Sequence, residues 1–546
     1  MLLGAANSRM LDTTSSRPCG EAIIELLEDY GVDTVFGIPG VHTQEFYRGL
    51  SKSRIQHVLT RHEQGAGFMA CGYARASGRP GVCVLITGPG VTNAATALGQ
   101  GYADSLPVLL LSSENATHTL HKGYGELHEI SDQSAVTKPL TGYNALAHSV
   151  AEVPDHISAA FESFTAGRPR PAHVAVPIDL LEQPVEGRWT VQHSRRSTDV
   201  EANQIKAAAA LIANSSQPLV CVGGGAVDAS AEVRALAERL GAPVLSSHAG
   251  KGVIPSGHPL NAGSAMHLAG GHALLSDCDT LIAIGTELAW TDSFVDELPI
   301  RGKIIRIDVD SSQFTGRYTT SVGVQADAKS ACAKLLAELG EGVNNEADGR
   351  ERAASAQTQN NAGRTDLEKR HQAVLSVVRQ MLPSNGILST DTSQITYTGQ
   401  ADFPVDAPRQ WLYGAGFCTL GGALPEAIGA ALACPDQPVM AVAGDGGFMF
   451  TLPELATAAE LKLSLPVLVW NNESLAQIKD GMVARGFKPT GVDSINPDFL
   501  AVGAAFGCAT ARPQSADELG ESIRTALSAG RPTLIEVHQD DRWLVQ

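Results

Sequence analysis

The sequence predicts an α/β protein built from three doubly wound parallel-sheet domains, and three observations lead to that prediction. Short apolar runs such as PVLLLSS and PVMAVA recur along the chain, and segments with apolar residues at helical spacing separate them. Runs that are apolar at every position fit strands buried on both faces, as in a parallel sheet covered by helices. The third observation is length, because 546 residues suffice for about three domains of ordinary size.

The first third of the chain alternates helices and strands from Pro18 onward. Pro18 can start a helix, the apolar residues of EAIIELLEDY recur at helical spacing, and Gly31 can end that helix. The segments TVF, HVLTR, GVCVLIT and PVLLLSS are typical of strands, and EQGAGFMACGYARASG is typical of a helix. We therefore predict a tail at 1–17, a first domain at 18–185 and a polar linker at 186–203.

The rest of the chain repeats this alternation twice. LVCVGGGAV, TLIAIGTEL and KIIRIDVDSS are predicted strands of a middle domain at 204–340. EGVNNEADGRERAASAQTQNNAGR is polar, which indicates a crossing linker at 341–364. GILSTD, PVMAVAGDGGF, LPVLVWNNES and PTLIEVHQ are predicted strands of a last domain at 365–546. Because the first and last blocks share a layout of similar length, we expect two related domains around a middle one.

Charge and composition disfavour several kinds of partner. The formal charge of −18 disfavours nucleic acid and anionic membranes. No apolar run reaches the roughly 18–20 residues of a membrane helix, and the start MLLGAANSRMLDTTSSRP lacks the features of a signal peptide. Nine cysteines occur singly, which fits reduced thiols in the cytoplasm and makes a structural zinc site a poor interpretation. We therefore predict a cytoplasmic protein without membrane or nucleic-acid partners.

Polar clusters follow two strands of the last block. The strand PVMAVA runs into residues 444–447, Gly-Asp-Gly-Gly, and the strand LPVLVW runs into Asn471 and Asn472. Both clusters therefore lie at the carboxyl ends of parallel strands, where open α/β sheets bind ligands. Asp445 and Asn472 offer hard oxygen ligands to Mg²⁺, and the glycines let backbone amides approach phosphate. Either cluster alone would also fit an ordinary turn after a strand.

GDG, 24 further residues and NN, each at the end of an apolar strand, together resemble the cofactor motif of thiamine-diphosphate-dependent enzymes. The resemblance covers nearly the whole chain and is to the group of acetolactate synthases, pyruvate oxidases and 2-oxo acid decarboxylases. It implies a pyrimidine-binding first domain, a middle domain and a diphosphate-binding last domain, with thiamine diphosphate and Mg²⁺ as cofactors. It also implies that Asp445, the side chain of Asn472 and the backbone carbonyl of Ser474 are metal ligands. The glycines that it places beside the cofactor are Gly444, Gly446 and Gly447.

The resemblance also assigns the acid that serves the aminopyrimidine of the cofactor. Thiamine loses the C2 proton of its thiazolium to its own 4′-imino group, and that imine forms only when a carboxyl exchanges a proton with N1′. Glu63 in RHEQGAGFMACGYAR opens a helix directly after a strand and has this position in the pattern. A glutamate at a helix N-terminus is also ordinary capping chemistry. Together with the metal motif, the resemblance implies a catalytic role for Glu63.

Three further segments resemble cofactor contacts of the group. GPGVTN, from Gly88 to Asn93, resembles the loop beside the pyrimidine. YGAGFCTLGGALPEAIGA resembles the stretch that holds the cofactor bent, with Leu420 as the wedge and the carbonyl of Cys418 accepting from the 4′-amino group. Acetolactate synthases often have methionine as the wedge, and Leu420 would also fit as a core leucine. The residues of STDTSQ that the resemblance places at the diphosphate are Ser393 and Gln394.

Departures from the acetolactate synthases concern the substrate pocket and flavin. Leu127-His128-Glu129 stands where they have Phe-Gln-Glu, and Gly481, after Asp480, falls near their acceptor-pocket tryptophan. The resemblance therefore implies a wider pocket with an extra acid. GTELAWTDSF lacks the arginine and paired aspartates of a flavin site, and residues 223–225, GGG, are not a dinucleotide fingerprint, so FAD is not expected. Pyruvate decarboxylases match no better, because this chain has Val41 in place of their aspartate and lacks their His-His pair.

These departures favour non-oxidative decarboxylation of a 2-oxo acid with a large polar or cationic side chain, through a C2 carbanion and an enamine. LHEISDQ and QIKDGMVARG look similar to segments of 5-guanidino-2-oxopentanoate decarboxylases. His128, Glu129, Asp132 and Asp480 could line an acidic pocket, and a guanidinium needs carboxylates in fork geometry. The acids would equally fit solvated loop positions. His128 could instead relay a proton to the carbanion, which would give it a catalytic role.

Two other functions stay open from the sequence. An acetolactate synthase-type carboligase would join two pyruvates, and a catalytically silent relative would act as a scaffold or binding subunit. In the group, the glutamate and the metal motif face each other across a subunit interface. The resemblance therefore implies a homodimer or a homotetramer.

Overall fold

The protein is described by a computed structural model that covers residues 16–192, 200–340 and 346–545. In these ranges it contains three six-stranded parallel sheets flanked by helices and one antiparallel pair, β1 (Arg17–Pro18) with β8 (Pro184–Val185). The predicted fold class, α/β with three doubly wound parallel-sheet domains, is confirmed. Most of the predicted tail and the centre of the first predicted linker lie outside the described residues.

The first sheet has the strand order β3-β2-β4-β5-β7-β6. Its central strands are buried along their whole length, because most of their side chains are apolar or small on both faces. The strands are β2 (Thr34–Gly37), β3 (Gln56–Leu59), β4 (Gly81–Leu85), β5 (Val108–Glu114), β6 (Tyr143–Leu146) and β7 (Ala172–Pro177). The helices are α1 (Cys19–Asp29), α2 (Gln44–Leu50), α3 (Glu63–Ser77), α4 (Pro89–Ala103), α5 (Gln133–Thr137), α6 (Val153–Ala166) and α7 (Ile178–Leu181).

The third sheet, β16-β15-β17-β18-β20-β19, repeats the topology of the first, since both read 2-1-3-4-6-5 when their strands are numbered along the chain. This agrees with the layout that the sequence suggested. Its strands are β15 (Ile387–Thr390), β16 (Trp411–Tyr413), β17 (Val439–Gly444), β18 (Pro466–Asn471), β19 (Ala509–Ala511) and β20 (Thr533–His538). Its helices are α14 (Asp366–Met381), α15 (Gln394–Asp402), α16 (Ala423–Ala433), α17 (Asp445–Thr451), α18 (Glu454–Glu460), α19 (Ala476–Ala484), α20 (Phe499–Ala505) and α21 (Ala516–Ala526).

The middle sheet differs, because its order β11-β10-β9-β12-β13-β14 reads 3-2-1-4-5-6, the order of dinucleotide-binding sheets. Its strands are β9 (Pro218–Val222), β10 (Val244–Ser246), β11 (Asn261–Gly263), β12 (Thr280–Ile284), β13 (Lys303–Asp308) and β14 (Val322–Gln325). Its helices are α8 (Ala202–Ala213), α9 (Ser230–Leu240), α10 (Ala269–Asp277), α11 (Trp290–Ser293) and α12 (Ala328–Leu339).

The polar segment interpreted as a linker at 341–364 folds differently from that interpretation. Residues 346–361 form α13 (Glu346–Asn361), which packs on α10 of the middle domain. Ala353 and Ala356 of α13 are buried in the core there, and Gly270 of α10 lies against the carbonyl of Ala356. The segment buries small side chains instead of large apolar ones, which explains why it resembled a linker.

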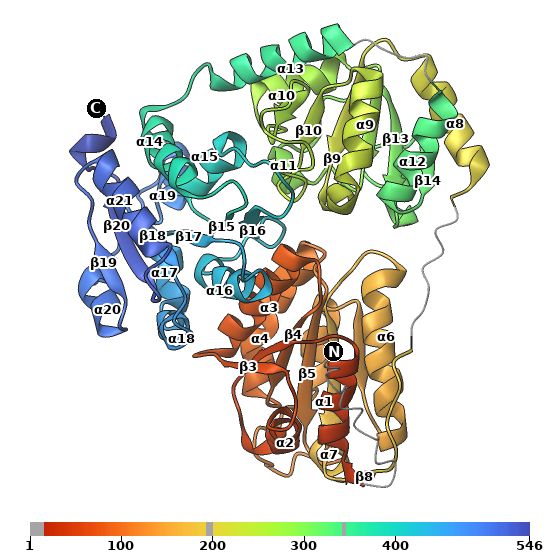
Figure 1. Cartoon of the computed structure of the whole chain (residues 1–546), viewed down its shortest axis with the longest axis vertical. Coiled ribbons are helices and arrows are strands. Elements are labelled where there is room, and N and C mark those ends of the chain that lie inside the picture. The colour runs from red at the N-terminus through yellow and green to blue at the C-terminus, as the bar shows by residue number, and fades with distance from the viewer. Residues whose placement is uncertain (1–15, 193–199, 341–345, 546) are drawn as a thin grey trace, which may run out of the picture.

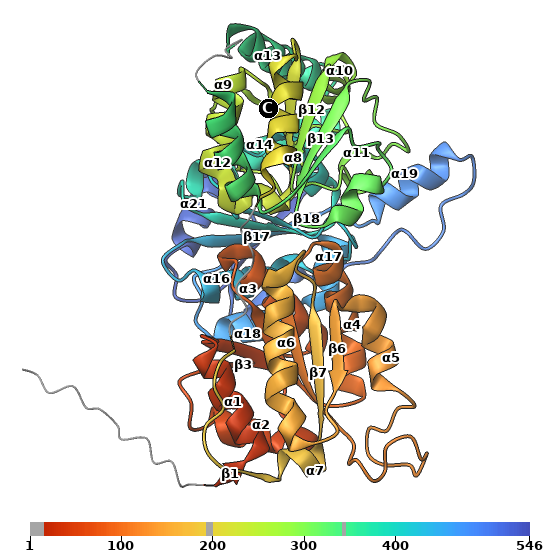
Figure 2. The same ribbon diagram turned by 90° about the vertical axis from the view of Figure 1, so that its right-hand side faces the viewer.

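The three domains are arranged with the third beside the contact between the other two (Figure 1). Helices α3 and α16 lie side by side and join the first domain to the third, and the middle domain lies at the opposite end of the molecule from the first (Figures 1 and 2). Figure 2 also shows α19 projecting from the third domain. Among the described helices, none has the length and apolarity needed to cross a membrane.

Candidate active site

The Gly-Asp-Gly-Gly turn lies at the carboxyl end of β17, as the sequence predicted. Gly444 ends the strand, and Asp445, which is only 3% exposed, is the first residue of α17. Strands β17 and β18 are neighbours, and their register pairs Gly444 with Trp470. Asp445 therefore lies beside the end of β18, next to Asn471, which explains how motifs 24 residues apart come together.

The Asn471–Ser474 loop has a fixed backbone. The side-chain oxygen of Asn471 accepts from the amide of Glu473 at 3.2 Å, and that of Asn472 accepts from the amide of Ser474 at 3.1 Å. Glu473 adopts a left-handed φ of 53°, which turns the chain sharply between these residues. The predicted metal ligands Asn472 and Ser474 are thus held on one tight turn.

Two residues that sequence reasoning did not single out complete this end of the sheet. Asn496 donates one hydrogen bond to Oδ2 of Asp445 at 2.7 Å and another to Oδ1 of Asn471 at 2.9 Å. Asp391, at the end of β15, is buried and accepts from the amide of Gly421 at 3.0 Å, and burial raises its pKa to about 6. A Cβ on Gly447 would lie 2.7 Å from the Asp391 carboxyl, so a glycine is needed there for packing alone.

The predicted diphosphate residues lie at the start of α15, close to the same turn. A Cβ on Gly444 would lie 3.1 Å from the Cβ of Ser393. Gln394 donates weakly to Asp480 at 3.3 Å, so the structure brings a predicted substrate residue beside a predicted cofactor residue. The side-chain oxygen Oε1 of Gln394 is buried and has no hydrogen-bond partner in the described part of the chain.

The stretch predicted to hold the cofactor bent is fixed by helix α4 of the first domain. Gln100 accepts from the amide and hydroxyl of Thr419, and Asp104 accepts from the amide of Gly416 at 2.8 Å. Cys418 is exposed and adopts a left-handed φ of 57°, which is uncommon outside glycine. Leu420 is half-buried.

Glu63 is the first residue of α3, and its carboxyl contacts α4. Asn93 donates to Oε2 of Glu63 at 2.9 Å, so the structure brings together these two predicted residues. The start of α3 is itself held by Glu454 of the third domain, which accepts from the amides of Arg61 and His62 at 3.0 and 3.1 Å. A carboxylate at this position is stabilised by the helix N-terminus.

The predicted pyrimidine loop packs against His128. A Cβ on Gly88, whose φ is 66°, would lie 2.5 Å from the carbonyl oxygen of His128, so only glycine fits there. His128 itself has a left-handed φ of 62°, and its ring contacts that of His42 edge to face at 5.5 Å. The turn before α4 and the His128 loop are thus fitted to each other.

The two predicted acids near His128 have structural partners within their own loop. Glu129 accepts from the backbone amides of residues 123, 125 and 126, and Asp132 caps α5 by accepting from the amide of Ala135 at 2.9 Å. Both line a cavity of about 220 Å³ together with Glu114, which is buried and whose pKa is raised by that burial. Glu114 accepts from the hydroxyl of Thr87 at 2.9 Å, so the cavity lies directly behind the Gly88 turn.

The predicted residues therefore form two groups within one chain. Glu63, Gly88, Asn93 and His128 lie on the first domain, and Asp445, Asn472 and their neighbours lie on the third. Among the described residues, no hydrogen bond or ion pair joins Glu63 to Asp445 or Asn472. In chemical terms the second group fits a divalent cation, because it offers hard oxygens, and its glycines let backbone amides approach a diphosphate.

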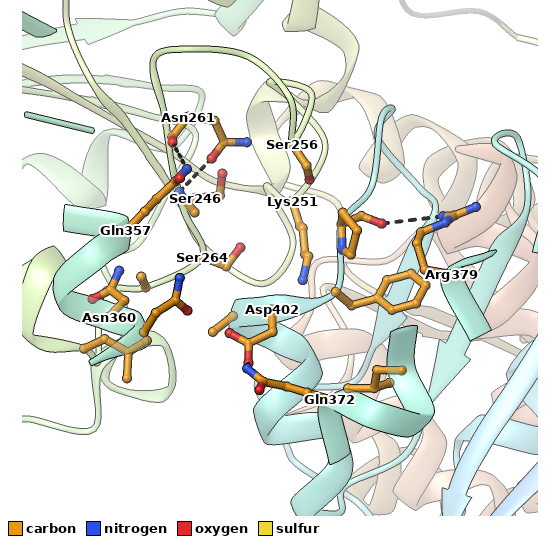
Figure 3. Close-up of a pocket in the computed structure, with 18 of the residues that line it drawn as sticks. Ser246, Lys251, Ser256, Asn261, Ser264, Gln357, Asn360, Gln372, Arg379 and Asp402 are labelled. Atoms are coloured by element: carbon orange, nitrogen blue, oxygen red, sulfur yellow. Dashed lines mark hydrogen bonds between the residues drawn. The ribbon is translucent and has the colours of Figure 1, made fainter. Parts of the chain in front are cut away.

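A larger cavity, of about 600 Å³, lies elsewhere, between the middle and third domains. Its lining includes Lys251, Asn261, Gln372, Arg379 and Asp402 (Figure 3). None of the predicted cofactor, metal or substrate residues lines it. It is therefore a feature of the domain junction and not of the candidate active site.

Comparison with known proteins identifies the parts of this architecture. Three domain models match: "Thiamine pyrophosphate enzyme, N-terminal TPP binding domain" at residues 17–136, its central domain at 205–335 and its C-terminal TPP binding domain at 391–537. A probable 2-ketoarginine decarboxylase of Pseudomonas aeruginosa is 46% identical over 521 residues, which cover 95% of this chain and 93% of that protein. Acetolactate synthase isozyme 1 large subunit of Escherichia coli is 32% identical over 97% of this chain and 95% of its own length. A probable acetolactate synthase large subunit of Methanocaldococcus jannaschii is 33% identical over 95% of this chain and 91% of its own length.

Proposed function

Because the chain belongs to the thiamine pyrophosphate enzyme family, we propose that it catalyses the non-oxidative decarboxylation of 5-guanidino-2-oxopentanoate, or 2-ketoarginine, with Mg²⁺ and thiamine diphosphate as cofactors. One observation carries the choice of substrate. The identity to a probable 2-ketoarginine decarboxylase is 46%, whereas the identity to two acetolactate synthases over a similar length is 32% and 33%.

In this proposal the third domain holds the metal and the diphosphate. Asp445, the side chain of Asn472 and the carbonyl of Ser474 would bind Mg²⁺, and Ser393 and Gln394 would contact diphosphate oxygens. When bound, the cofactor supplies a nucleophilic carbon and accepts the electron pair left when CO₂ departs. The amide nitrogen of Gln394 supports this assignment, because its hydrogen bonds to Gln477 and Asp480 are long, at 3.4 and 3.3 Å, and leave this donor available to a diphosphate oxygen.

Glu63 would hold the proton that is exchanged with N1′ of the aminopyrimidine. Its Oε2 accepts from Asn93, and its Oε1 has no hydrogen bond among the described residues, which leaves that oxygen available to a ligand. Glu454 fixes the start of the same helix, so the carboxyl is carried by a rigid element. The positions of Cys418 and Leu420 would orient the cofactor, and both depend on the contacts of Gln100 and Asp104 with their loop.

Acidic side chains near both groups support a cationic substrate tail. Asp480 lies beside Gln394, and Glu129 and Asp132 line the small cavity behind Gly88 with Glu114. A guanidinium is recognised best by carboxylates that accept two parallel hydrogen bonds. His128, whose backbone carbonyl lies against the Gly88 turn, would deliver a proton to the substrate carbon after CO₂ leaves.

A second copy of the chain would complete the site in this proposal. Among the described residues of one chain no hydrogen bond or ion pair joins Glu63 to Asp445, although the proposal needs both for the chemistry. Several large apolar side chains next to the predicted cofactor residues are exposed, which fits a protein interface. They are Val41, Leu127, Phe417, Met449, Phe450, Leu475, Ile478, Phe487 and Ile495.

The test is decarboxylation by the purified protein with thiamine diphosphate and MgCl₂. We expect CO₂ release from 5-guanidino-2-oxopentanoate with a kcat/KM at least about tenfold above that for a neutral 2-oxo acid of similar length, because one paired charge contributes about 1.4 kcal/mol or more. Pyruvate is the second comparison. Strong acetolactate formation from pyruvate, with no preference for the guanidino substrate, would overturn the assignment in favour of a carboligase.

Two inactive variants test both the catalytic residues and the shared site. Glu63→Gln and Asp445→Ala should each abolish turnover, and Asp445→Ala should also abolish Mg²⁺-dependent cofactor binding in calorimetry. When the two variants are co-expressed, a site built across two chains regains about a quarter of wild-type activity, because half of a statistical mixture is heterodimer with one intact site in two. No recovery would place both residues in one chain's site. Wild-type turnover by Glu63→Gln would contradict the proton exchange assigned to Glu63.

A further inference from the structure

The loop that carries the predicted metal ligands is itself held by a second segment, residues 492–496. Ser474 pairs with Asp493 in an antiparallel bridge, and the amide of Leu475 donates to the carbonyl of Val492 at 2.7 Å. The amide of Ser494 donates to the carbonyl of Glu473 at 3.0 Å. The ligand loop is therefore one side of a short two-chain ladder, and its partner segment ends at Asn496.

The side chain of Asn496 reaches from this ladder to the buried carboxylate. Its nitrogen donates to Oδ2 of Asp445 at 2.7 Å and to Oδ1 of Asn471 at 2.9 Å, which uses both of its hydrogens. The hydroxyl of Ser494 donates to its oxygen at 3.1 Å, so the orientation of the amide is fixed. Asn496 thus ties the end of β17 to the end of β18.

Asp445 depends on this contact because it lacks a charged partner. Among the described residues, no lysine, arginine or histidine forms an ion pair with Asp445, although its side chain is buried. A neutral amide on Oδ2 offsets part of the desolvation cost without neutralising the charge. Oδ1 has no hydrogen bond in the described part of the chain, so one oxygen is fixed and the other is free to bind a cation.

We propose that Asn496 is a positioning residue that presets the Asp445 carboxylate for the divalent cation and holds it in register with the Asn472–Ser474 loop. This inference rests on the proposed function only in assigning a cation to Asp445. Groups that orient a metal ligand from behind typically change metal affinity about 10- to 100-fold when they are removed. The effect should appear in cation affinity and not in the reaction once the cation is bound.

The experiment is a Mg²⁺ titration of the full-length protein at saturating thiamine diphosphate. Binding is measured by calorimetry and by the change in tryptophan fluorescence. Asn496→Ala should raise the Kd for Mg²⁺ by about 10- to 100-fold. Asn496→Leu, which keeps the shape of the side chain but cannot donate, should do the same and serves if the alanine variant folds poorly. With the active substrate, kcat at saturating Mg²⁺ should stay within about twofold of wild type, whereas the Mg²⁺ concentration for half activity rises.

Two controls separate the outcomes. Thr490 is exposed and lies shortly before the segment 492–496, and its hydroxyl donates to the carbonyl of Lys488. Thr490→Ala should therefore leave the Kd unchanged. Asp445→Ala gives the Kd of a site without its carboxylate. Unchanged Mg²⁺ affinity in both Asn496 variants, with thermal midpoints equal to wild type, would overturn the inference. If Asp445→Ala also left the affinity unchanged, the metal assignment itself would fail. The binding assay shows this without any measurement of decarboxylation.

Discussion

The third domain meets its two neighbours through junctions of opposite character. Helices α3 and α16 join it to the first domain so closely that a Cβ on Gly72 would lie 2.1 Å from the carbonyl oxygen of Glu426. Its junction with the middle domain holds a polar cavity of about 600 Å³, with Lys251 at its inner wall (Figure 3). The closely packed α3–α16 contact, called the dry junction below, connects the two domains that carry the predicted cofactor residues. The junction with the cavity, called the polar junction, connects the third domain to the middle domain, which carries none of them.

The charges at the two junctions differ in the same way. Arg75 of α3 pairs with Asp104 at 2.8 Å and with Glu426 at 3.3 Å, and none of the three side chains is more than 10% exposed. Lys251 has no acid partner in the described chain, and its ammonium donates to the carbonyls of Gly399 and Gln400 at 2.8 and 2.6 Å. The first junction is thus fixed by packing and a buried ion network. The second is held by hydrogen bonds and by an ion pair between Arg409 and Asp228, whose aspartate is largely exposed.

The largest effect is expected from a side chain forced into the dry junction. Gly72→Val places methyl groups where the backbone of α16 lies, so the helices must separate. Such overpacking should lower the free energy of unfolding by about 3 kcal/mol or more. Urea denaturation followed by circular dichroism measures it. Gly257→Ala is the matched control near the polar junction, where a Cβ meets nothing within 4 Å, and should change stability by less than about 0.5 kcal/mol. Equal effects at both positions would remove the distinction between the junctions.

A smaller effect is expected from the ion network. Burial raises the pKa of Glu426 from 4.5 to about 7. Arg75 opposes this shift, but its guanidinium is shared with Asp104, whose carboxylate adds to the shift. The folded chain therefore keeps a proton that the unfolded chain loses, and stability falls as the pH rises from about 4.5 to 7. Glu426→Gln should remove this decline and become about 3 kcal/mol more stable relative to wild type at pH 8 than at pH 4. Urea unfolding at the two pH values measures it. A constant difference between the proteins would show that folding does not shift the pKa of Glu426.

The dry junction and the sheets were predictable to different degrees. Apolar strands and helical spacing predicted three parallel sheets, and the matching strand orders of the first and third domains follow from their similar layout. Helix α13 was mistaken for a linker because Ala353 and Ala356 pack through small side chains. The close contact at Gly72 could not be predicted, because a glycine in a helix signals close approach without naming its partner.

The candidate site divides along the same line. Asp445 and Asn472 could be predicted to lie together because both follow adjacent strands, and parallel strands end at one edge of a sheet. Asn496 and Glu454 were missed, since each acts on a residue far away in the chain through one side-chain contact. The only signal at Asn496 is the following Pro-Asp, which indicates a turn and the capping of α20 by Asp498. Local pattern predicts elements and their ends, but not which loop folds back over them.

The smallest effect at neutral pH is expected at the polar junction. Lys251→Met removes two hydrogen bonds to carbonyls but also removes a buried charge, and methionine can still pack on Trp411. The net change at pH 7 should stay within about 1 kcal/mol, because these terms oppose each other. Burial lowers the pKa of Lys251 from 10.5 to about 7, so the unfolded chain binds more protons than the folded chain between these values.

Stability that depends on Lys251 should therefore rise with pH from about 7 to 10.5, opposite in sign to the trend at Glu426. Urea unfolding of wild type and Lys251→Met at pH 7 and pH 9.5 measures the difference, which should move in favour of the wild type at the higher pH. Lys251→Arg controls for the loss of the hydrogen bonds, because arginine keeps its charge throughout this range. A difference that does not change with pH would mean that water in the cavity solvates the Lys251 ammonium at the inner wall of the junction. The middle domain would then be held to the third through a hydrated surface, and the contrast with the packed α3–α16 contact would be greater still.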